Sequence, residues 1–321
     1  MKKSNPAAGP PCPQAGSNSF MQTLFLINPG SGKRKNPAKT AELIHEIYGR
    51  AGLAAQTAFI DFPSLDECLQ QALEAGVRNV FAVGGDGTVN AIAARLIDKQ
   101  VNFGVIPKGS GNGFARNLGF SINTRLAIKQ SMDSWSIKID TGSFNDTPFV
   151  NVAGVGLDAV VAEIFAHKKK RGFSRYVRSS AEGLMSYRPE AYQIDIDGEE
   201  LFRENIMAIA IANGTQWGYD AKISPQARLT DGLLDVIIVK HFPLIGAGGL
   251  IGRLFNGQIY NSRYVEVRQG KHIRIVRQAP GSAQVDGEPF EAGKEISIRV
   301  KEKSLNLLVP NTLTYKKIQS L

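Results

Sequence analysis

The stretch VFAVGGDGTVN, from Val80 to Asn90, decides the fold of this chain. Its four apolar residues, Val80–Val83, predict a buried strand, and the helical spacing that follows predicts a helix over Val89–Ile97. Three glycines stand within the four-residue turn between them. Glycines let an anion approach the backbone closely, and the N-terminus of a helix favours negative charge. The stretch therefore predicts a strand–turn–helix unit that binds a phosphate group.

Asp86 lies inside this turn, where its carboxylate would repel a phosphate group. Two roles remove the conflict: the carboxylate can face a bridging cation, or it can accept the proton of an attacking hydroxyl group. The alternative is a tight turn in which Asp86 only caps the helix. A cap does not need three glycines, so a functional Asp86 is favoured.

Two further glycine turns follow apolar strands in the first half of the chain. Thr23–Ile27 precedes Asn28-Pro29-Gly30-Ser31-Gly32-Lys33, and Phe103–Ile106 precedes Pro107-Lys108-Gly109-Ser110-Gly111-Asn112-Gly113. The first lacks the spacing of a Walker loop, and by itself it fits an ordinary turn equally well. Alternating strands and helices predict an open parallel sheet, in which the carboxyl ends of the strands meet at one edge. Three converging turns predict a nucleotide site.

Local signals place a second strand and two helix starts between these turns. Ala54–Ile60 is the second strand. Asn36-Pro37 offers an N-cap and a first-turn proline, and Ser64–Glu67 matches a capping box. Cys68 falls on the apolar stripe of the helix that follows, which favours a core position over a nucleophilic role.

After Trp135 the pattern changes to short strands, with helical spacing only in Ala159–Tyr187 and Leu244–Phe255. Asp197-Gly198 is a hairpin signal. The predicted strands are Ser136–Ile139, Phe149–Val152, Tyr192–Ile196, Ile206–Ala212, Leu234–Val239, Val265–Arg268, Ile273–Val276, Ile296–Val300 and Leu305–Val309. The fold class is therefore α/β followed by β: an N-terminal open parallel-sheet domain and a C-terminal antiparallel β-sandwich domain.

Length and composition complete the domain plan of the 321-residue chain. We expect a disordered tail over residues 1–20, a nucleotide-binding domain over 21–135, a sandwich domain over 136–310 and a C-terminal tail over 311–321. A signal peptide and a spanning apolar run are both missing, which favours a cytoplasmic protein. The net charge of +9 favours anionic partners. Two cysteines and four scattered histidines exclude a disulfide framework and argue against structural zinc.

The segments NPGSGK, GGDGTVN and PKGSGNGFARNLG, in this order, resemble the catalytic domain shared by diacylglycerol kinases, sphingosine kinases and soluble bacterial lipid kinases. The resemblance continues through NVAGVGLDAVV (Asn151–Val161), SPQARLTDGLLDVIIV (Ser224–Val239) and VDGEPF (Val285–Phe290), and it covers Met21 to about Val309. It implies an N-terminal fold similar to those of NAD kinases and phosphofructokinases. It also implies ATP and Mg²⁺ as cofactors.

The resemblance implies ATP-binding positions in all three glycine turns. They are Asn28, Pro29, Gly30, Ser31, Gly32, Gly84, Gly85, Asp86, Gly87, Thr88, Asn90 and Ser110. In soluble bacterial members a structural magnesium ion lies at a turn that corresponds to the Asp231 carboxylate and the carbonyl groups of Arg228 and Leu233. A plain hairpin turn at Asp231-Gly232 is compatible with that role.

The resemblance implies two candidates for the general base. Bacterial members are assigned the Glu that corresponds to Glu288, whereas sphingosine kinases are assigned the Asp that corresponds to Asp86. Asp286-Gly287 by itself is a turn signal. Asp158 matches a position that faces the lipid head group in related kinases, and an N-cap for the following helix is the equally weighted alternative.

The function predicted is that of a lipid kinase, which transfers the γ-phosphate of ATP to a hydroxyl group of a diacylglycerol- or sphingoid-like lipid. The alternatives are a non-catalytic regulator on the same fold and a soluble-substrate kinase similar to NAD kinase. The basic run His167–Arg171 is either a solvated face or a peripheral contact with an anionic membrane surface. The predicted partners are thus a lipid substrate and an anionic membrane surface. The sequence leaves open whether the protein forms a homodimer, and it contains no nucleic-acid-binding motif.

Overall fold

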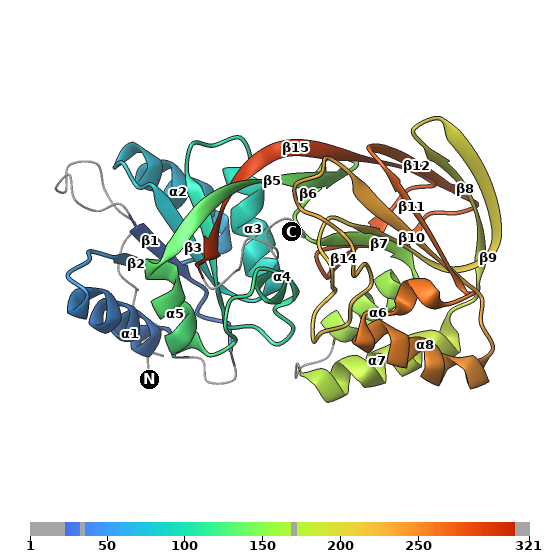
Figure 1. Ribbon diagram of the computed structural model, residues 1–321, viewed down its shortest axis with the longest axis horizontal. Coiled ribbons are helices and arrows are strands. Elements are labelled where there is room, and N and C mark those ends of the chain that lie inside the picture. Colours follow the sequence, from blue (N-terminus) through green and yellow to red (C-terminus); the bar gives the residue numbers. More distant parts are fainter. Residues whose placement is uncertain (1–22, 33–35, 168–171, 312–321) are drawn as a thin grey trace, which may run out of the picture. The chain divides into compact units, whose positions relative to one another are not determined.

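The computed structural model describes residues 23–32, 36–167 and 172–311 (Figure 1). The chain divides into two compact units. Unit 1 runs to Gly109 and adds Gly119–Ile137 and the chain from Leu305, whereas unit 2 comprises Ser110–Leu118 and Lys138–Ser304. Strands β5 (Ser134–Phe144) and β15 (Glu295–Pro310) contribute residues to both units.

Unit 1 is built on a parallel sheet with the strand order β4-β3-β1-β2. The strands are β1 (Thr23–Ile27), β2 (Gln56–Phe59), β3 (Asn79–Gly84) and β4 (Asn102–Pro107), and the C-terminal end of β15 pairs with β4. In the register Ile27 lies beside Val83 and Val83 beside Ile106, so β1, β3 and β4 end level with one another. The predicted parallel sheet is confirmed.

The helices of unit 1 pack apolar stripes against this sheet. They are α1 (Pro37–Arg50), α2 (Leu65–Glu74), α3 (Asp86–Leu96) and α5 (Thr124–Met132). On one face, Ile44, Tyr48 and Ile128 bury their side chains against Phe25 and Phe81. Burial of such side chains is the main favourable contribution to folding.

Both predicted helix starts are confirmed in position, but only one of them has the predicted capping bond. Asn36 caps α1, because its Oδ1 accepts the Lys39 N–H at 2.9 Å. Ser64 makes no capping bond to α2; its hydroxyl group donates instead to the carbonyl of Asp61 at 3.2 Å. The short 3₁₀ turn η1 (Phe62–Ser64), which begins at the Phe-Pro pair, leads directly into α2 and replaces the capping box.

Unit 2 is a sandwich of antiparallel strands, as predicted. The long strand β9 joins its layers: the C-terminal half pairs with β7 and β10, and the N-terminal half pairs with β8, which leads to β12 and β15. Its strands, besides β5 and β15, are β6 (Thr147–Phe149), β7 (Val152–Gly156), β8 (Glu190–Ile196), β9 (Glu199–Ala212), β10 (Leu234–Lys240), β11 (Val265–Gly270), β12 (His272–Arg277), β13 (Gly281–Val285) and β14 (Glu288–Ala292). A large apolar cluster of unit 2 includes Phe144, Tyr192, Ile209 and Ile275.

Several strands of unit 2 differ from their predicted bounds; β9, for example, begins at Glu199 and not at Ile206. The predicted strand Phe149–Val152 is interrupted, because the backbone N–H groups of Val150 and Asn151 bond to Asp286. The segments predicted as Ile296–Val300 and Leu305–Val309 belong to the single strand β15. The hairpin of β13 and β14 was predicted only as a turn, since its strands are short and carry few apolar residues.

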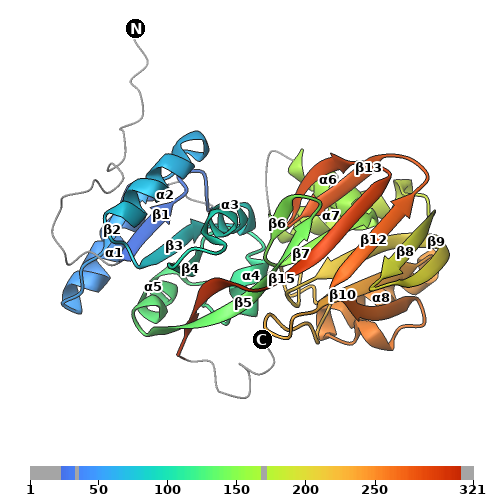
Figure 2. The ribbon, with the colours of Figure 1, turned by 90° about the horizontal axis from the view of Figure 1, so that it is seen from above.

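Three helices cover the outer face of β7, β9 and β10: α6 (Leu157–Ala166), α7 (Phe173–Ser186) and α8 (Leu244–Asn256). Figure 2 shows the strands of unit 2 laid across the view with these helices beneath them. The stretch with predicted helical spacing, Ala159–Tyr187, forms the two helices α6 and α7; most of the basic run between them, residues 168–171, lies outside the described residues. Within the described part of the chain, no helix is long and apolar enough to cross a membrane.

Candidate functional site

The first two glycine turns meet at the level edge of the parallel sheet in unit 1. Asn28, directly after β1, donates its backbone N–H to the Val83 carbonyl at 3.1 Å. Its side-chain Nδ2 donates to Thr88 Oγ1 at 2.7 Å, and its Oδ1 accepts the Gly30 N–H at 2.8 Å. One asparagine side chain therefore bridges the two turns and fixes their geometry.

Glycine is required at this edge because the neighbouring backbones and side chains leave no space. A Cβ atom added at Gly84 would lie 2.5 Å from Thr88, and one added at Gly85 would lie 3.1 Å from Gly109 Cα. Lys108, which follows β4, donates its backbone N–H to the Gly84 carbonyl at 2.7 Å. The turns therefore pack backbone against backbone at this edge, a close approach that glycine permits.

Lys108 is the cation that the structure adds to these turns. Its Nζ donates to Thr40 Oγ1, and a Cβ atom added at Gly32 would lie 3.3 Å from the lysine side chain. Burial lowers the pKa of the Lys108 ammonium group. Lys33, the other lysine of the glycine turns, lies outside the described residues.

Asp86 is the first residue of α3, and Gly85 occupies the N-cap position. Asp86 therefore does not occupy the N-cap position, and the alternative in which it only caps the helix is wrong. The side chain is half-buried at the N-terminus of an eleven-residue helix, where the helix dipole favours its charge. Thr88, two residues further on, accepts the hydrogen bond from Asn28, so Asp86 stands directly beside the bridged turns.

Ser110 belongs to unit 2 and is exposed. The segment that it begins, which includes α4 (Gly113–Asn117), packs against residues 215–221. A Cβ atom added at Gly113 would lie 2.7 Å from the Trp217 carbonyl oxygen, and Arg116 forms an ion pair with Asp220 at 2.7 Å. The third glycine turn is thus divided: Lys108 and Gly109 pack with unit 1, and the rest packs with unit 2.

Asp286 has a structural role in unit 2. Its buried carboxylate accepts the backbone N–H groups of Val150, Asn151 and Val152 at 2.9–3.0 Å. The residue adopts a left-handed conformation, with φ of 49°, at the turn of the β13–β14 hairpin. The carboxylate therefore ties this hairpin to the junction between β6 and β7.

Glu288, two residues later, is exposed at the first position of β14. The turn that presents it is held by Gln284, whose Oε1 accepts the Gly287 N–H at 2.9 Å. Gln284 Nε2 also donates to Asp158 Oδ2 at 3.1 Å. The buried Gln284 thus links Asp158 to the turn at Gly287 that precedes Glu288. Only its place in a strand next to the Asp-Gly-Glu motif could have suggested it.

Asp158 is the second residue of α6, and Gly156 takes the N-cap position, so the N-cap interpretation of Asp158 is wrong. Its Oδ1 accepts the Ala159 N–H at 2.9 Å. A Cβ atom added at Gly154 would lie 2.2 Å from Asp158 Oδ2, so glycine there makes room for the carboxylate. Burial raises the pKa of the Asp158 carboxyl to about 7, although hydrogen bonds from Gln284 and Ala159 lower it.

This raised pKa gives Asp158 a measurable effect on stability. The folded protein binds the proton more tightly than the unfolded chain, so the stabilisation is complete below about pH 4 and is lost as the pH rises through about 7. Asp158→Asn removes the titration. At about pH 4 the wild type has its full stabilisation relative to the variant. At pH 8 we expect this advantage in the free energy of unfolding to be smaller by about 1–3 kcal/mol. Urea titrations at several pH values measure it, and a difference that stays constant would contradict the shift.

The turn at Asp231 precedes β10 and carries several acidic groups. Asp231 Oδ1 accepts the Leu233 N–H at 3.1 Å, and the buried Asp140 accepts the N–H groups of Gly232 and Lys303 at 2.7 Å each. Burial, Asp235 and Asp140 raise the pKa of Asp231, against the hydrogen bond from Leu233. Accumulated negative charge and oxygen donors fit a hard cation. Asp140, which sequence reasoning missed, fixes the backbone of this turn.

The described part of the chain shows no cluster of three or more His, Cys, Asp or Glu side chains that could hold a metal ion. A cation at the Asp231 turn would therefore depend on one carboxylate and on backbone carbonyl groups such as those of Arg228 and Leu233. That donor set suits a magnesium or calcium ion, which binds oxygen ligands and tolerates water in its remaining positions.

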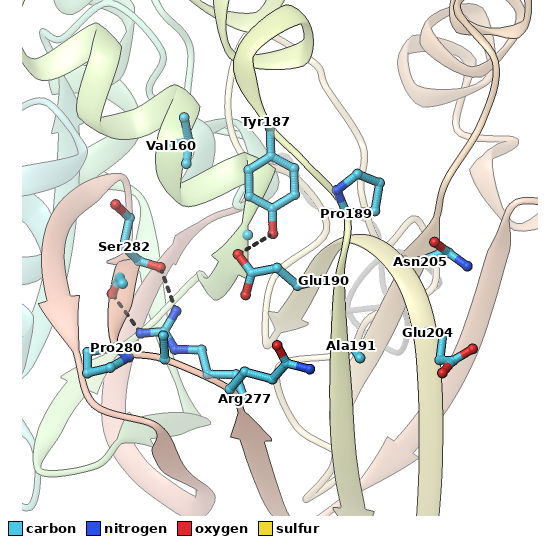
Figure 3. A pocket seen from close by; sticks show the side chains of 14 residues that line it. Val160, Tyr187, Pro189, Glu190, Ala191, Glu204, Asn205, Arg277, Pro280 and Ser282 are labelled. Carbon is cyan, nitrogen blue, oxygen red and sulfur yellow. Dashed lines mark hydrogen bonds between the residues drawn. The ribbon is translucent and has the colours of Figure 1, made fainter.

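A cavity of about 500 Å³ lies elsewhere in unit 2, and none of the predicted site residues lines it (Figure 3). Tyr187 and Tyr192 both donate to the Glu190 carboxylate on its wall, at 3.2 and 3.3 Å. Arg277 is buried and donates to four carbonyl groups, including those of Gly281 and Ala292 at 2.6 Å. Its guanidinium group shapes the wall of the cavity.

Comparisons with known proteins show the family to which the chain is similar. The family model of the diacylglycerol kinase catalytic domain matches residues 22–144, and that of the YegS C-terminal NAD kinase beta sandwich-like domain matches residues 151–309. A Chromohalobacter salexigens protein named "Probable lipid kinase YegS-like" is 30% identical over 228 residues, which cover 68% of this chain and 72% of the relative.

Two further relatives match over most of their length. The diacylglycerol kinase of Bacillus subtilis is 27% identical over 272 residues, which cover 82% of this chain and 88% of that protein. A crystal structure of a diacylglycerol kinase from Bacillus anthracis covers 93% of this chain and all of its own, with a TM-score of 0.69 and 18% identity. The latter similarity supports the fold, and the fold class predicted from the sequence is confirmed.

Proposed function

Because this chain belongs to the diacylglycerol kinase family of lipid kinases, we propose that it transfers the γ-phosphate of ATP to a hydroxyl group of a diacylglycerol- or sphingoid-like lipid. The observation that carries this proposal is the pair of glycine turns bridged by Asn28 and Thr88 at 2.7 Å. Their backbones lie too close to neighbouring atoms for side chains, and Asp86 stands beside them at the N-terminus of α3. This arrangement suits a triphosphate and a carboxylate that acts on the attacking group.

We assign the phosphates to the turns of unit 1, namely Asn28–Gly32 and Gly84–Asn90, and Ser110 to the same nucleotide. Lys108 adds the positive charge that an anionic triphosphate needs. In the reaction the lipid oxygen bonds to the γ-phosphorus as the bond to the β,γ-bridging oxygen breaks, and ADP leaves. A carboxylate, that of Asp86 or of Glu288, accepts the hydroxyl proton. Asp158 is assigned to the lipid head group.

The proposal includes a structural Mg²⁺ at the turn of Asp231, Arg228 and Leu233, whose role when bound is to hold that turn. A cation that binds only the folded chain stabilises it by mass action. Magnesium chloride should therefore raise the Tm of the wild type more than that of Asp231→Ala, by about 2–4 °C at saturation if the site contributes about 1 kcal/mol. Thermal unfolding measures both. Equal shifts in the two proteins would show that this turn binds no metal.

The acceptor can be identified directly. The protein is incubated with γ-labelled ATP and separate panels of lipid extract and soluble metabolites, and the labelled product is isolated. We expect label in the lipid fraction and none in the soluble panel. Label in a soluble nucleotide would support the alternative of an NAD-kinase-like enzyme, and no transfer to any acceptor, with ATP bound, would support a non-catalytic regulator.

A further inference from the structure

Helix α8 presents an outward face that carries almost no polar side chains. Its inward residues Ala247, Leu250 and Leu254 pack on the apolar cluster that covers β9 and β10. The outward face carries Leu244 and Ile245, which are 69% and 95% exposed, together with Ile251 and glycines. A helix on a water-facing surface normally places charged or polar residues there. The packing of the described residues of unit 2 leaves these isoleucine and leucine side chains in contact with solvent.

The apolar surface continues from α8 onto α7. The rings of Phe173, at the start of α7, and Phe255, near the end of α8, lie 6.0 Å apart, so the two helices touch at this point. Phe173 and Val177 are each about half exposed. We call the exposed side chains of Leu244, Ile245, Ile251, Phe173 and Val177 the α7–α8 patch. These exposed apolar side chains lie on two helices that meet at Phe173 and Phe255, and exposed apolar side chains gathered in this way mark a contact surface.

All charged residues in the chain segment that contains α8 are basic, and one of them, Lys240, is paired with Glu266 of β11 at 3.2 Å. From Val236 to Val265 the sequence contains no Asp or Glu, and its Lys and Arg residues are Lys240, Arg253 and Arg263. The Tyr264 ring lies 3.7 Å from a Cβ atom added at Gly246, in the N-terminal half of α8. The Arg263 guanidinium group lies over this ring, so a cation stands beside that half of the helix. The Lys222 side chain lies 3.3 Å from a Cβ atom added at Gly257, at the other end of the helix.

We infer that the α7–α8 patch is a membrane-docking surface, and that α8 inserts Leu244 and Ile245 into a bilayer that contains anionic lipid. An apolar helix face bordered by cations matches the boundary between acyl chains and anionic head groups. A second copy of the chain would bring the cations around α8 against like cations, whereas an anionic bilayer neutralises them. The inference rests on the proposed function only in that a lipid acceptor gives the enzyme a reason to reach a membrane.

The first test removes the apolar side chains. Sedimentation with phosphatidylcholine vesicles that contain phosphatidylglycerol measures the partition coefficient of the wild type and of Leu244→Gln/Ile245→Gln. We expect at least a roughly tenfold loss, because two inserted side chains are replaced by polar ones. The matched control is Ile122→Gln/Leu126→Gln, which also changes two exposed apolar residues, 59% and 51% exposed, but in unit 1. It should bind as the wild type does.

The second test changes charge at one position of α8. A side chain at Gly249 meets no protein atom within 4 Å, so Gly249→Glu and Gly249→Lys should both fold. On anionic vesicles the Glu variant should bind several-fold more weakly than the Lys variant, and salt should reduce the difference. Equal binding by the two, or unchanged binding by Leu244→Gln/Ile245→Gln, would overturn the inference.

Two measurements separate the remaining outcomes. If a second copy covers the patch, sedimentation equilibrium will show a wild-type dimer that Leu244→Gln/Ile245→Gln dissociates, and this result overturns the inference. Phosphorylation of a short-chain, water-dispersed diacylglycerol should be the same in wild type and variant. If the wild type phosphorylates no lipid while vesicle binding still depends on Leu244 and Ile245, the proposed function fails and the docking surface stands.

Discussion

Replacing Asp86 by Asn is expected to lower kcat at least about a hundredfold while ATP binding persists. The carboxylate stands beside the bridged glycine turns, at the N-terminus of α3. Asparagine has the same shape but accepts no proton and gives a cation a weaker ligand. Loss of a negative charge next to phosphates does not weaken their binding, so the defect should appear in kcat. Steady-state kinetics and titration calorimetry with ATP measure the two quantities.

Asp66→Asn is the matched control for Asp86→Asn. Asp66 also lies in the first turn of a helix, α2, but its carboxylate pairs with Arg95 at 2.6 Å on an exposed surface. Exposed pairs contribute little to stability, so both kcat and Tm should stay close to the wild-type values. Normal turnover by Asp86→Asn would exclude the residue from the chemistry and leave Glu288 as the base.

The glycine turns of unit 1 could be predicted because their signals are local. Short apolar strands alternate with helical spacing between Thr23 and Pro107, and parallel strands bring their carboxyl ends to one edge. The structure confirms this edge, and Asn28 and Thr88 meet there. The division of the third turn at Gly109 depends on contacts of residues 110–118 with residues 215–221. No local pattern carries such contacts.

Side chains that act over long sequence separations were the least predictable. Asp140 holds the backbone at Gly232 and Lys303, and Gln284 joins Asp158 to the turn at Gly287. Each is an ordinary polar residue within a strand, and only the assembled sandwich shows which backbone groups it satisfies. The Asp-Gly-Glu motif shows most clearly what a local pattern does not predict. It contains two acidic residues, of which Asp286 is buried and Glu288 is exposed.

Asp286→Ala is expected to lower the free energy of unfolding by at least about 3 kcal/mol, measured by urea titration. The variant leaves three N–H groups, those of Val150, Asn151 and Val152, without their acceptor in a buried junction. Each buried donor left without an acceptor costs about 1–3 kcal/mol. Asp286→Asn retains an acceptor oxygen and should lose less. An Asp286→Ala protein as stable as the wild type would contradict the structural role.

Glu288→Gln separates chemistry from this structural effect within the same motif. Glu288 is exposed, and the bonds that shape its turn are made by Asp286 and Gln284. The substitution should therefore leave the urea midpoint unchanged. If Glu288 accepts the hydroxyl proton, kcat falls at least about a hundredfold with little change in ATP affinity. The pH–rate profiles of Asp86→Asn and Glu288→Gln then identify the base. The variant that lacks the true base loses the rise of rate with increasing pH. The second variant keeps this rise at reduced amplitude. A Glu288→Gln enzyme with wild-type kcat at every pH would assign the proton to Asp86.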